Sequence, residues 1–132
     1  MNYETLLHKH TLKATPQRLG ILSLMHKNGH ISIDELFEQI KKQFNSISLA
    51  TLYKNINAML ESALITEVKI PNMKAKYEIT KATHAHLLCN QCGEFKDIEL
   101  DLEKLLMQTE QKSNYKLNET SLIFSGLCEK CK

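Results

Sequence analysis

All four cysteines of this 132-residue chain fall in two Cys-x-x-Cys pairs, Cys89/Cys92 and Cys128/Cys131. Each pair can present two thiolates at one turn, and zinc takes four thiolates in a tetrahedron. A redox site needs only one such pair, and disulfides are rare in cytosolic chains. The spacing therefore predicts one closed, structural Zn²⁺ site per chain, which ties the C-terminal end to the turn at Cys89–Cys92.

The composition, 42% hydrophobic and 24% charged, is that of a soluble globular protein. The sequence contains no run of about 18 apolar residues, and its first residues do not resemble a secretory signal, so we expect a cytoplasmic protein. The net charge of +2 is unevenly spread. Residues 1–82 hold eleven Lys/Arg against seven Asp/Glu, whereas residues 83–132 hold six against eight. A basic N-terminal part is typical of modules that bind polyanions.

The N-terminal part shows helix signals followed by strand signals. Thr15 and Pro16 suit the start of a helix, Ser32 and Glu35 form a capping box, and Ser48 can cap another helix. The apolar spacing predicts helices over residues 3–13, from Pro16 to Asn28, from the capping box to Phe44 and from Ser48 to Leu60. Strands are predicted over 64–70 and 75–80, with a turn at 71–74. Helices followed by a hairpin indicate a winged helix-turn-helix.

The C-terminal part has a different pattern. Short strands are predicted over residues 84–89 and 93–99, a helix over 101–113, and a last strand over 116–126. The whole chain is therefore predicted to be α+β.

A second candidate metal site lies just before the first cysteine pair. His84 and His86 share one face of the predicted strand. If the strands turn at Cys89–Cys92, Asp97 lies directly opposite His84, and the three side chains converge away from the thiolates. Imidazole and carboxylate ligands together suit Fe²⁺, Mn²⁺ or Zn²⁺. The alternative interpretation is a pair of surface histidines.

Four motifs taken together resemble one known family. They are Thr15-Pro16-Gln17-Arg18, Ser48-Leu-Ala-Thr51-Leu-Tyr53, His84-Ala-His86-Leu-Leu-Cys89-Asn-Gln-Cys92-Gly93 and Cys128-Glu-Lys-Cys131. In order and spacing the chain resembles the ferric uptake regulator (Fur) superfamily, in particular its peroxide-sensing PerR branch. The resemblance implies a homodimeric repressor of transcription. Residues 1–82 would form a winged-helix domain that binds a palindromic, A/T-rich DNA operator, and residues 83–132 an α/β dimerisation domain with the structural zinc site.

The resemblance also implies a regulatory site for Fe²⁺ or Mn²⁺. Its ligands would be His30, Glu78, His84, His86 and Asp97. Peroxide would then oxidise His30 or His84 in the iron form. Asp97 resembles the peroxide sensors, whereas Glu78 departs from their commoner aspartate. Thr83 and Ala85 occupy positions that supply a further metal site in some iron sensors, so we expect that site to be absent.

The helix from Ser48 is the expected recognition helix, with its amino end suited to a phosphate. The candidate DNA contacts are Arg18, Ser48, Thr51, Tyr53, Lys54, Asn57, Lys69, Lys74 and Lys76. Three other functions remain open: an iron- or zinc-responsive repressor of the same family, a zinc-stabilised module that binds no DNA, and a non-haem iron enzyme. The enzyme is disfavoured because His30 and Glu78 would fill positions that a substrate needs. We therefore expect no catalytic residues.

Overall fold

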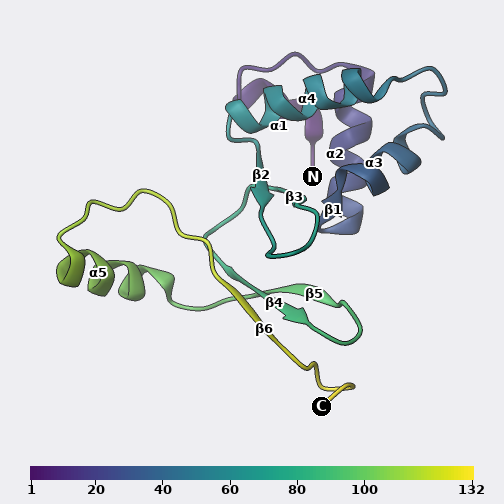
Figure 1. The fold of residues 1–132 in the computed structure, drawn as a ribbon. Coiled ribbons are helices and arrows are strands. Elements are labelled where there is room, and N and C mark those ends of the chain that lie inside the picture. The colour runs from purple at the N-terminus through teal and green to yellow at the C-terminus, as the bar shows by residue number, and fades with distance from the viewer. The chain divides into compact units, whose positions relative to one another are not determined.

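Four helices and a small three-stranded sheet form the first part of the chain (Figure 1). The computed structural model describes residues 1–132 and divides after Thr80, slightly before the boundary at residue 82 suggested by the sequence. We call Met1–Thr80 the N-terminal unit and Lys81–Lys132 the C-terminal unit. The helices of the N-terminal unit are α1 (Tyr3–Lys9), α2 (Pro16–Asn28), α3 (Ile33–Ile40) and α4 (Leu49–Glu61), and its strands are β1 (Ile31–Ser32), β2 (Ile65–Val68) and β3 (Lys76–Ile79).

Side-chain caps start three of these helices where the sequence predicted. Thr15, Ser32 and Ser48 each accept a hydrogen bond from the backbone N–H three residues later. Such caps satisfy N–H groups that have no partner within the helix. The helices enclose one apolar core, whose completely buried members are Leu7, Ile21, Leu22, Met25, Ile31, Leu36, Ile40, Leu52, Ile56 and Met59. The three strands lie in the antiparallel order β1-β3-β2, which completes the predicted winged helix-turn-helix.

Several predicted element boundaries were wrong. The first helix ends at Lys9 instead of residue 13, and Thr11 takes a left-handed backbone with φ 59°. The third helix ends at Ile40, and Phe44 packs against the core from the turn that follows. The two-residue strand β1 was missed because so short a segment carries no alternation of apolar and polar residues.

The C-terminal unit is a second three-stranded sheet with one helix. Its elements are β4 (Ala85–Cys89), β5 (Phe95–Ile98), α5 (Leu102–Ser113) and β6 (Ile123–Gly126), and the last strand is much shorter than the predicted 116–126. The strand order is β5-β4-β6, with β5 antiparallel and β6 parallel to β4 (Figure 1). The middle strand β4, with His86 and Cys89, therefore lies between β5, which carries Asp97, and β6, which leads to the second cysteine pair.

The predicted register of the β4–β5 hairpin was wrong by two residues. The residue opposite Asp97 is His86, whereas a turn at Cys89–Cys92 predicts His84 in that position. The turn is longer than the Cys89–Cys92 pair, because Cys89 donates its N–H to the carbonyl of Glu94 at 2.9 Å and Gly93 lies within the turn at φ 79°. A shift of two residues preserves the face on which each side chain lies. His84, His86 and Asp97 therefore still share one face.

Few side chains are buried in the C-terminal unit: Ala85, His86, Cys89 and Leu102. Large apolar side chains are exposed instead, namely Leu100, Leu105, Met107, Tyr115, Phe124 and Leu127. A unit of this size with so small a core needs another source of stability, such as a metal ion or a partner subunit. None of the helices has the length and apolar character needed to cross a membrane.

Candidate metal centres and nucleic-acid interface

The four cysteines meet at one end of the C-terminal sheet. Cys89 ends β4, and the parallel pairing of Cys89 with Gly126 brings the segment after β6 beside it. The Sγ atoms of Cys92 and Cys128 lie 3.7 Å apart, and all four sulfur atoms lie within 4.8 Å of one another. Thiolates that share a tetrahedral zinc ion at about 2.3 Å lie about 3.8 Å from one another. The four-thiol group therefore fits a structural zinc ion.

Backbone hydrogen bonds prepare one of these thiols for metal binding. The N–H groups of Cys92 and Cys128 donate to Cys89 Sγ at 3.5 and 3.4 Å and lower the pKa of that thiol to about 6. A side-chain hydrogen bond with Cys128, together with desolvation, raises the pKa of the Cys131 thiol to about 12. Zinc binding must therefore release protons from this group.

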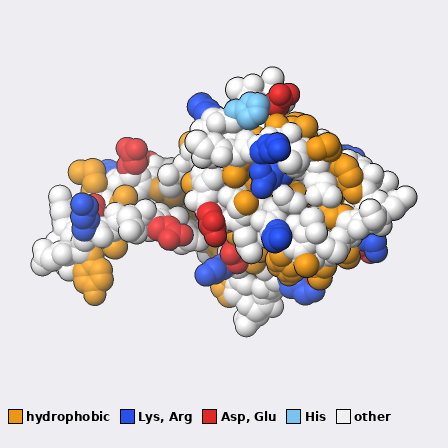
Figure 2. Space-filling model, turned by 90° about the horizontal axis from the view of Figure 1, so that it is seen from above, with side chains coloured by type: hydrophobic (Ala, Val, Ile, Leu, Met, Phe, Trp, Pro, Cys, Tyr) orange, Lys and Arg blue, Asp and Glu red, His pale blue; other side chains and the backbone are white.

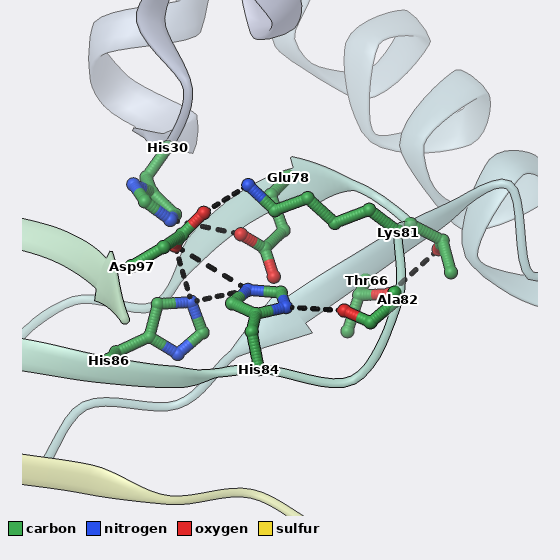
Figure 3. A network of polar contacts seen from close by, with 9 residues as sticks. His30, Thr66, Glu78, Lys81, Ala82, His84, His86 and Asp97 are labelled. Atoms are coloured by element: carbon green, nitrogen blue, oxygen red, sulfur yellow. Dashed lines mark hydrogen bonds and ion pairs between the residues drawn. The ribbon is translucent and has the colours of Figure 1, made fainter. Parts of the chain in front are cut away.

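His84 just before β4, His86 on β4 and Asp97 on β5 also meet (Figure 3). The Nε2 atoms of the two histidines are 3.1 Å apart, and they lie 3.4 Å (His84) and 3.2 Å (His86) from Asp97 Oδ1. Ligand atoms that share one ion at about 2.1 Å lie about 3 to 3.5 Å from one another. The three donor atoms of this histidine–aspartate group therefore fit one divalent ion, as the sequence analysis expected of these residues.

A backbone carbonyl fixes the orientation of His84. Nδ1 of His84 lies 2.8 Å from the carbonyl oxygen of Ala82, which can only accept a hydrogen bond, so Nδ1 carries the proton. The lone pair of a neutral His84 is then on Nε2, which faces His86 and Asp97. This pattern is common for histidines that bind metals.

Sequence reasoning missed two residues that contact this group. The ring of Phe95 stacks on that of His86, with centroids 4.9 Å apart and planes 17° from parallel. Phe95 is two residues from Asp97 on β5, and its place on the same face could have been predicted from that spacing. Lys81 forms an ion pair with Oδ2 of Asp97 (Figure 3). No regular spacing places Lys81 there, because it lies before β4 begins.

The other two expected ligands, His30 and Glu78, lie together in the N-terminal unit. His30 follows Gly29, the C-cap of α2, and directly precedes β1, which pairs with the β3 strand that carries Glu78. Nε2 of His30 lies 2.9 Å from Oε2 of Glu78. The side chains are only 10% and 4% exposed, so Glu78 is not the exposed strand residue that its local sequence suggests.

The expected recognition helix α4 presents mostly exposed side chains at its candidate positions. Ser48, Lys54 and Asn57 are exposed and Thr51 is half-buried. Leu49 and Tyr53 lie three residues before the buried Leu52 and Ile56, a spacing that favours the core, but they are 42% and 40% exposed. Figure 2 shows Lys and Arg side chains distributed over the face of the N-terminal unit that is turned toward the viewer, with apolar side chains between them.

Several of the lysine and arginine side chains expected to contact DNA already form contacts within the chain. Arg18 donates through Nε to Asn55 Oδ1 at 3.1 Å and through Nη1 to the carbonyl of Lys13 at 3.1 Å. In the β2–β3 hairpin, Lys74 pairs with Asp34, and this contact raises the pKa of the lysine. Lys76 of the same hairpin lies 3.9 Å from Glu35.

Comparisons with known proteins agree with the fold. The crystal structure of the Campylobacter jejuni peroxide stress regulator is 38% identical to this chain, with a TM-score of 0.78 and coverage of 99% of this chain and 100% of that one. The ferric uptake regulation protein of Bacillus subtilis is 28% identical over 95% of this chain and 89% of that protein. The peroxide-responsive repressor PerR of Staphylococcus saprophyticus is 25% identical over 96% of this chain and 87% of that protein.

The sequence model of the ferric uptake regulator family matches residues 9–125. This range includes the winged helix from α2 to β3, the His30–Glu78 pair, the histidine–aspartate group and the first cysteine pair. The second cysteine pair follows directly after the matched range and completes the four-thiol group. With its motifs, its fold and the matched range in agreement, the chain belongs to the ferric uptake regulator family.

Proposed function

We propose that this metal-responsive transcriptional regulator is a homodimeric repressor that binds DNA when its regulatory metal is bound and senses peroxide by oxidation of a ligand histidine. The observation that carries the proposal is the convergence of His84 Nε2 and His86 Nε2 on one oxygen of Asp97, at 3.4 and 3.2 Å. Mixed nitrogen and oxygen donors suit Fe²⁺ or Mn²⁺. The four-thiol group has a different donor set and would keep a structural Zn²⁺.

In this proposal His30 and Glu78 complete the site. They are the two ligands that the N-terminal unit can offer, already within 2.9 Å of each other. Binding of all five ligands to one ion would favour one orientation of the DNA-binding unit. An effector acts by binding one conformation better than another. In a dimer, that orientation would set the distance between the two recognition helices and so the match to two operator half-sites.

A homodimer is supported by the surface of the C-terminal unit. Its exposed apolar residues, with Met107 at 60%, Tyr115 at 70% and Leu127 at 54% exposed, are of the kind that a subunit interface covers. The proposed partner is a second copy of this chain. Analytical ultracentrifugation of the zinc-bound protein should therefore give the mass of a dimer.

In this proposal peroxide acts on a ligand histidine through the bound iron. Fe²⁺ held by these residues would activate hydrogen peroxide beside its ligands and would be regenerated in the net reaction. One oxygen atom of hydrogen peroxide would be added to a ring carbon of His84 or His30, the hydrogen of that carbon would stay on the ring oxygen or a ring nitrogen, and the other oxygen atom would leave as water. The oxidised ring is a poorer ligand, so the metal and then the DNA would be released.

The test compares the Fe²⁺-bound and Mn²⁺-bound forms after treatment with hydrogen peroxide. Mass spectrometry of tryptic peptides should find one added oxygen atom on the His84 or His30 peptide of the iron form and none in the manganese form. The peptides containing His8 and His10, which lie outside both metal groups, serve as internal controls. Equal oxidation of all histidine peptides, or none on His30 and His84, would contradict peroxide sensing.

Iron sensing is the second candidate function. It is favoured by Glu78, since the commoner residue of the peroxide sensors at this position is aspartate, and by the similarity to the Bacillus subtilis ferric uptake regulation protein. Operator affinity measured with Fe²⁺, Mn²⁺ and Zn²⁺ would distinguish an iron-, peroxide- or zinc-responsive repressor. Continued oxygen consumption under turnover conditions would instead indicate a non-haem iron enzyme.

DNA binding should depend strongly on salt and on α4. Replacing Lys54 by alanine should weaken binding to A/T-rich palindromic duplexes and to random duplexes alike, and should lower the slope of log affinity against log salt by about 0.9, as expected for one lost phosphate contact. Lys104→Ala on α5, which is also exposed, is the matched control. Fluorescence anisotropy at several salt concentrations measures both effects, and an unchanged slope in the Lys54 variant would exclude that contact.

A further inference from the structure

The carboxylate of Asp97 is shared between two kinds of partner. Its Oδ1 atom faces the Nε2 atoms of His84 and His86, whereas its Oδ2 atom forms an ion pair with the Lys81 ammonium (Figure 3). All four residues belong to the C-terminal unit. A cation therefore already lies on the carboxylate that a metal ion would use.

Lys81 has room to leave this position. Its side chain is 48% exposed and that of Asp97 is 27% exposed. Lys81, His84 and Asp97 are among the residues that line a pocket of about 510 Å³, whose other acidic residue is Glu99. The flexible lysine stem can move its ammonium along this pocket into water or toward Glu99 while the backbone stays fixed.

We propose that Lys81 is an internal competitor of the regulatory metal for Asp97, and that it raises the metal concentration at which the site fills. The proposal rests on the proposed role of Asp97 as a ligand of the regulatory metal. When a divalent ion binds Asp97, the ion pair with Lys81 must weaken or break, and any ammonium that remains nearby repels the ion. Both effects make metal binding weaker than the three donor atoms alone would allow.

If Lys81 supported metal binding instead of competing with it, its removal would change the metal affinity in the opposite direction. If Lys81 instead served to orient Asp97 toward the histidines, its removal would leave the carboxylate free to rotate and would weaken metal binding. A competitor and an orienting residue are thus separated by the direction of the change in affinity.

The experiment measures Mn²⁺ binding to the full-length, zinc-bound protein by isothermal titration calorimetry, with free Mn²⁺ checked by its electron paramagnetic resonance signal. Lys81→Met and Lys81→Gln should each bind Mn²⁺ about three- to tenfold more tightly than the unchanged protein, because a partly exposed ion pair and its repulsion of the ion are removed. Lys81→Arg keeps the charge and should stay close to the unchanged protein. Lys96→Met is the matched control, since Lys96 is an exposed lysine of the same hairpin, 3.8 Å from Glu94.

Unchanged or weaker Mn²⁺ binding in both neutral Lys81 variants, with circular dichroism that matches the unchanged protein, would overturn the proposal. Tightening in Lys96→Met to the same extent would also overturn it, because the effect would then come from net charge alone. Asp97→Ala tests the proposed function separately. If that variant binds Mn²⁺ as the unchanged protein does, Asp97 is no ligand, and the regulatory site itself is wrong.

Discussion

Replacement of Cys128 by serine should remove the zinc ion and unfold the C-terminal unit. Cys128 holds the segment after β6 to Cys89 and Cys92, through its Sγ atom at 3.7 Å from Cys92 and its N–H at 3.4 Å from Cys89 Sγ. The unit has a small apolar core and many exposed apolar side chains, so little else stabilises it. Structural zinc contributes about 10 kcal/mol or more of apparent binding free energy in small zinc domains.

The expected loss of zinc and of stability in the Cys128→Ser variant can be measured in two ways. Zinc content, determined by atomic absorption, should fall from one ion per chain to nearly none. The melting transition of the C-terminal unit should disappear, because a loss of even 1 kcal/mol lowers the melting temperature of a small domain by about 4 to 8 °C and the zinc ion contributes several times more. Ser121→Ala, an exposed change in the same unit, is the control and should alter neither quantity. A Cys128→Ser variant that keeps its zinc and its melting temperature would exclude the four-thiolate site.

The same site should lose zinc as the pH falls. The pKa values of Cys92 and Cys131 are raised, so these thiols hold protons near neutral pH that zinc must displace. The pKa of Cys89 is lowered to about 6, so this residue stays a thiolate until the pH falls through that value and then adds one more proton to the competition. Zinc affinity measured against a chelator should therefore decrease steadily from neutral pH downward and more steeply below about pH 6.

Residue spacing alone predicts the four-thiol group, whereas the histidine–aspartate group also requires an assumption about strand pairing. The cysteine pairs need only their order in the chain, because each Cys-x-x-Cys turn presents its two thiolates locally. The convergence of His84, His86 and Asp97 was predicted although the assumed register was wrong. The error came from the turn, where Gly93 adds length, but an even shift keeps side chains on their face. An odd shift would have separated Asp97 from both histidines.

Other features could not be predicted from spacing. His30 and Glu78 are distant in the sequence, and their contact depends on the pairing of β1 with β3, in which β1 has only two residues. Local sequence favours a loop histidine and an exposed glutamate, and only the resemblance to the family singled them out. Lys81 precedes β4 and belongs to no periodic pattern, so its ion pair with Asp97 is visible only in three dimensions. The spacing of Tyr53 from the buried Ile56 alone would favour the core, but the side chain of Tyr53 is 40% exposed.

Replacement of Asp97 by alanine should abolish the dependence of DNA binding on Mn²⁺. Asp97 Oδ1 is the atom toward which both histidine Nε2 atoms converge, at 3.4 and 3.2 Å. Loss of a residue that merely supports a metal ligand costs about 10- to 100-fold in metal affinity, so loss of a ligand should cost about 100-fold or more. A metal effector coupled to DNA by about 1 to 3 kcal/mol raises DNA affinity by about 5- to 150-fold, and the variant should lose this increase.

The measurement is fluorescence anisotropy with a labelled A/T-rich palindromic duplex, with and without Mn²⁺. Glu94→Gln is the matched control, since Glu94 is an exposed carboxylate of the same hairpin that faces Lys96 rather than the histidines. Asp97→Ala should bind the duplex with the same low affinity in both conditions, while its zinc content and its non-specific DNA binding stay unchanged, because the four-thiol group and α4 are untouched. Asp97→Ala that still responds to Mn²⁺ would show that the effector metal binds elsewhere. A variant that binds tightly without metal would instead show that neutralising Asp97 is sufficient, and that the ion acts on this carboxylate by its charge rather than by joining ligands from the two units.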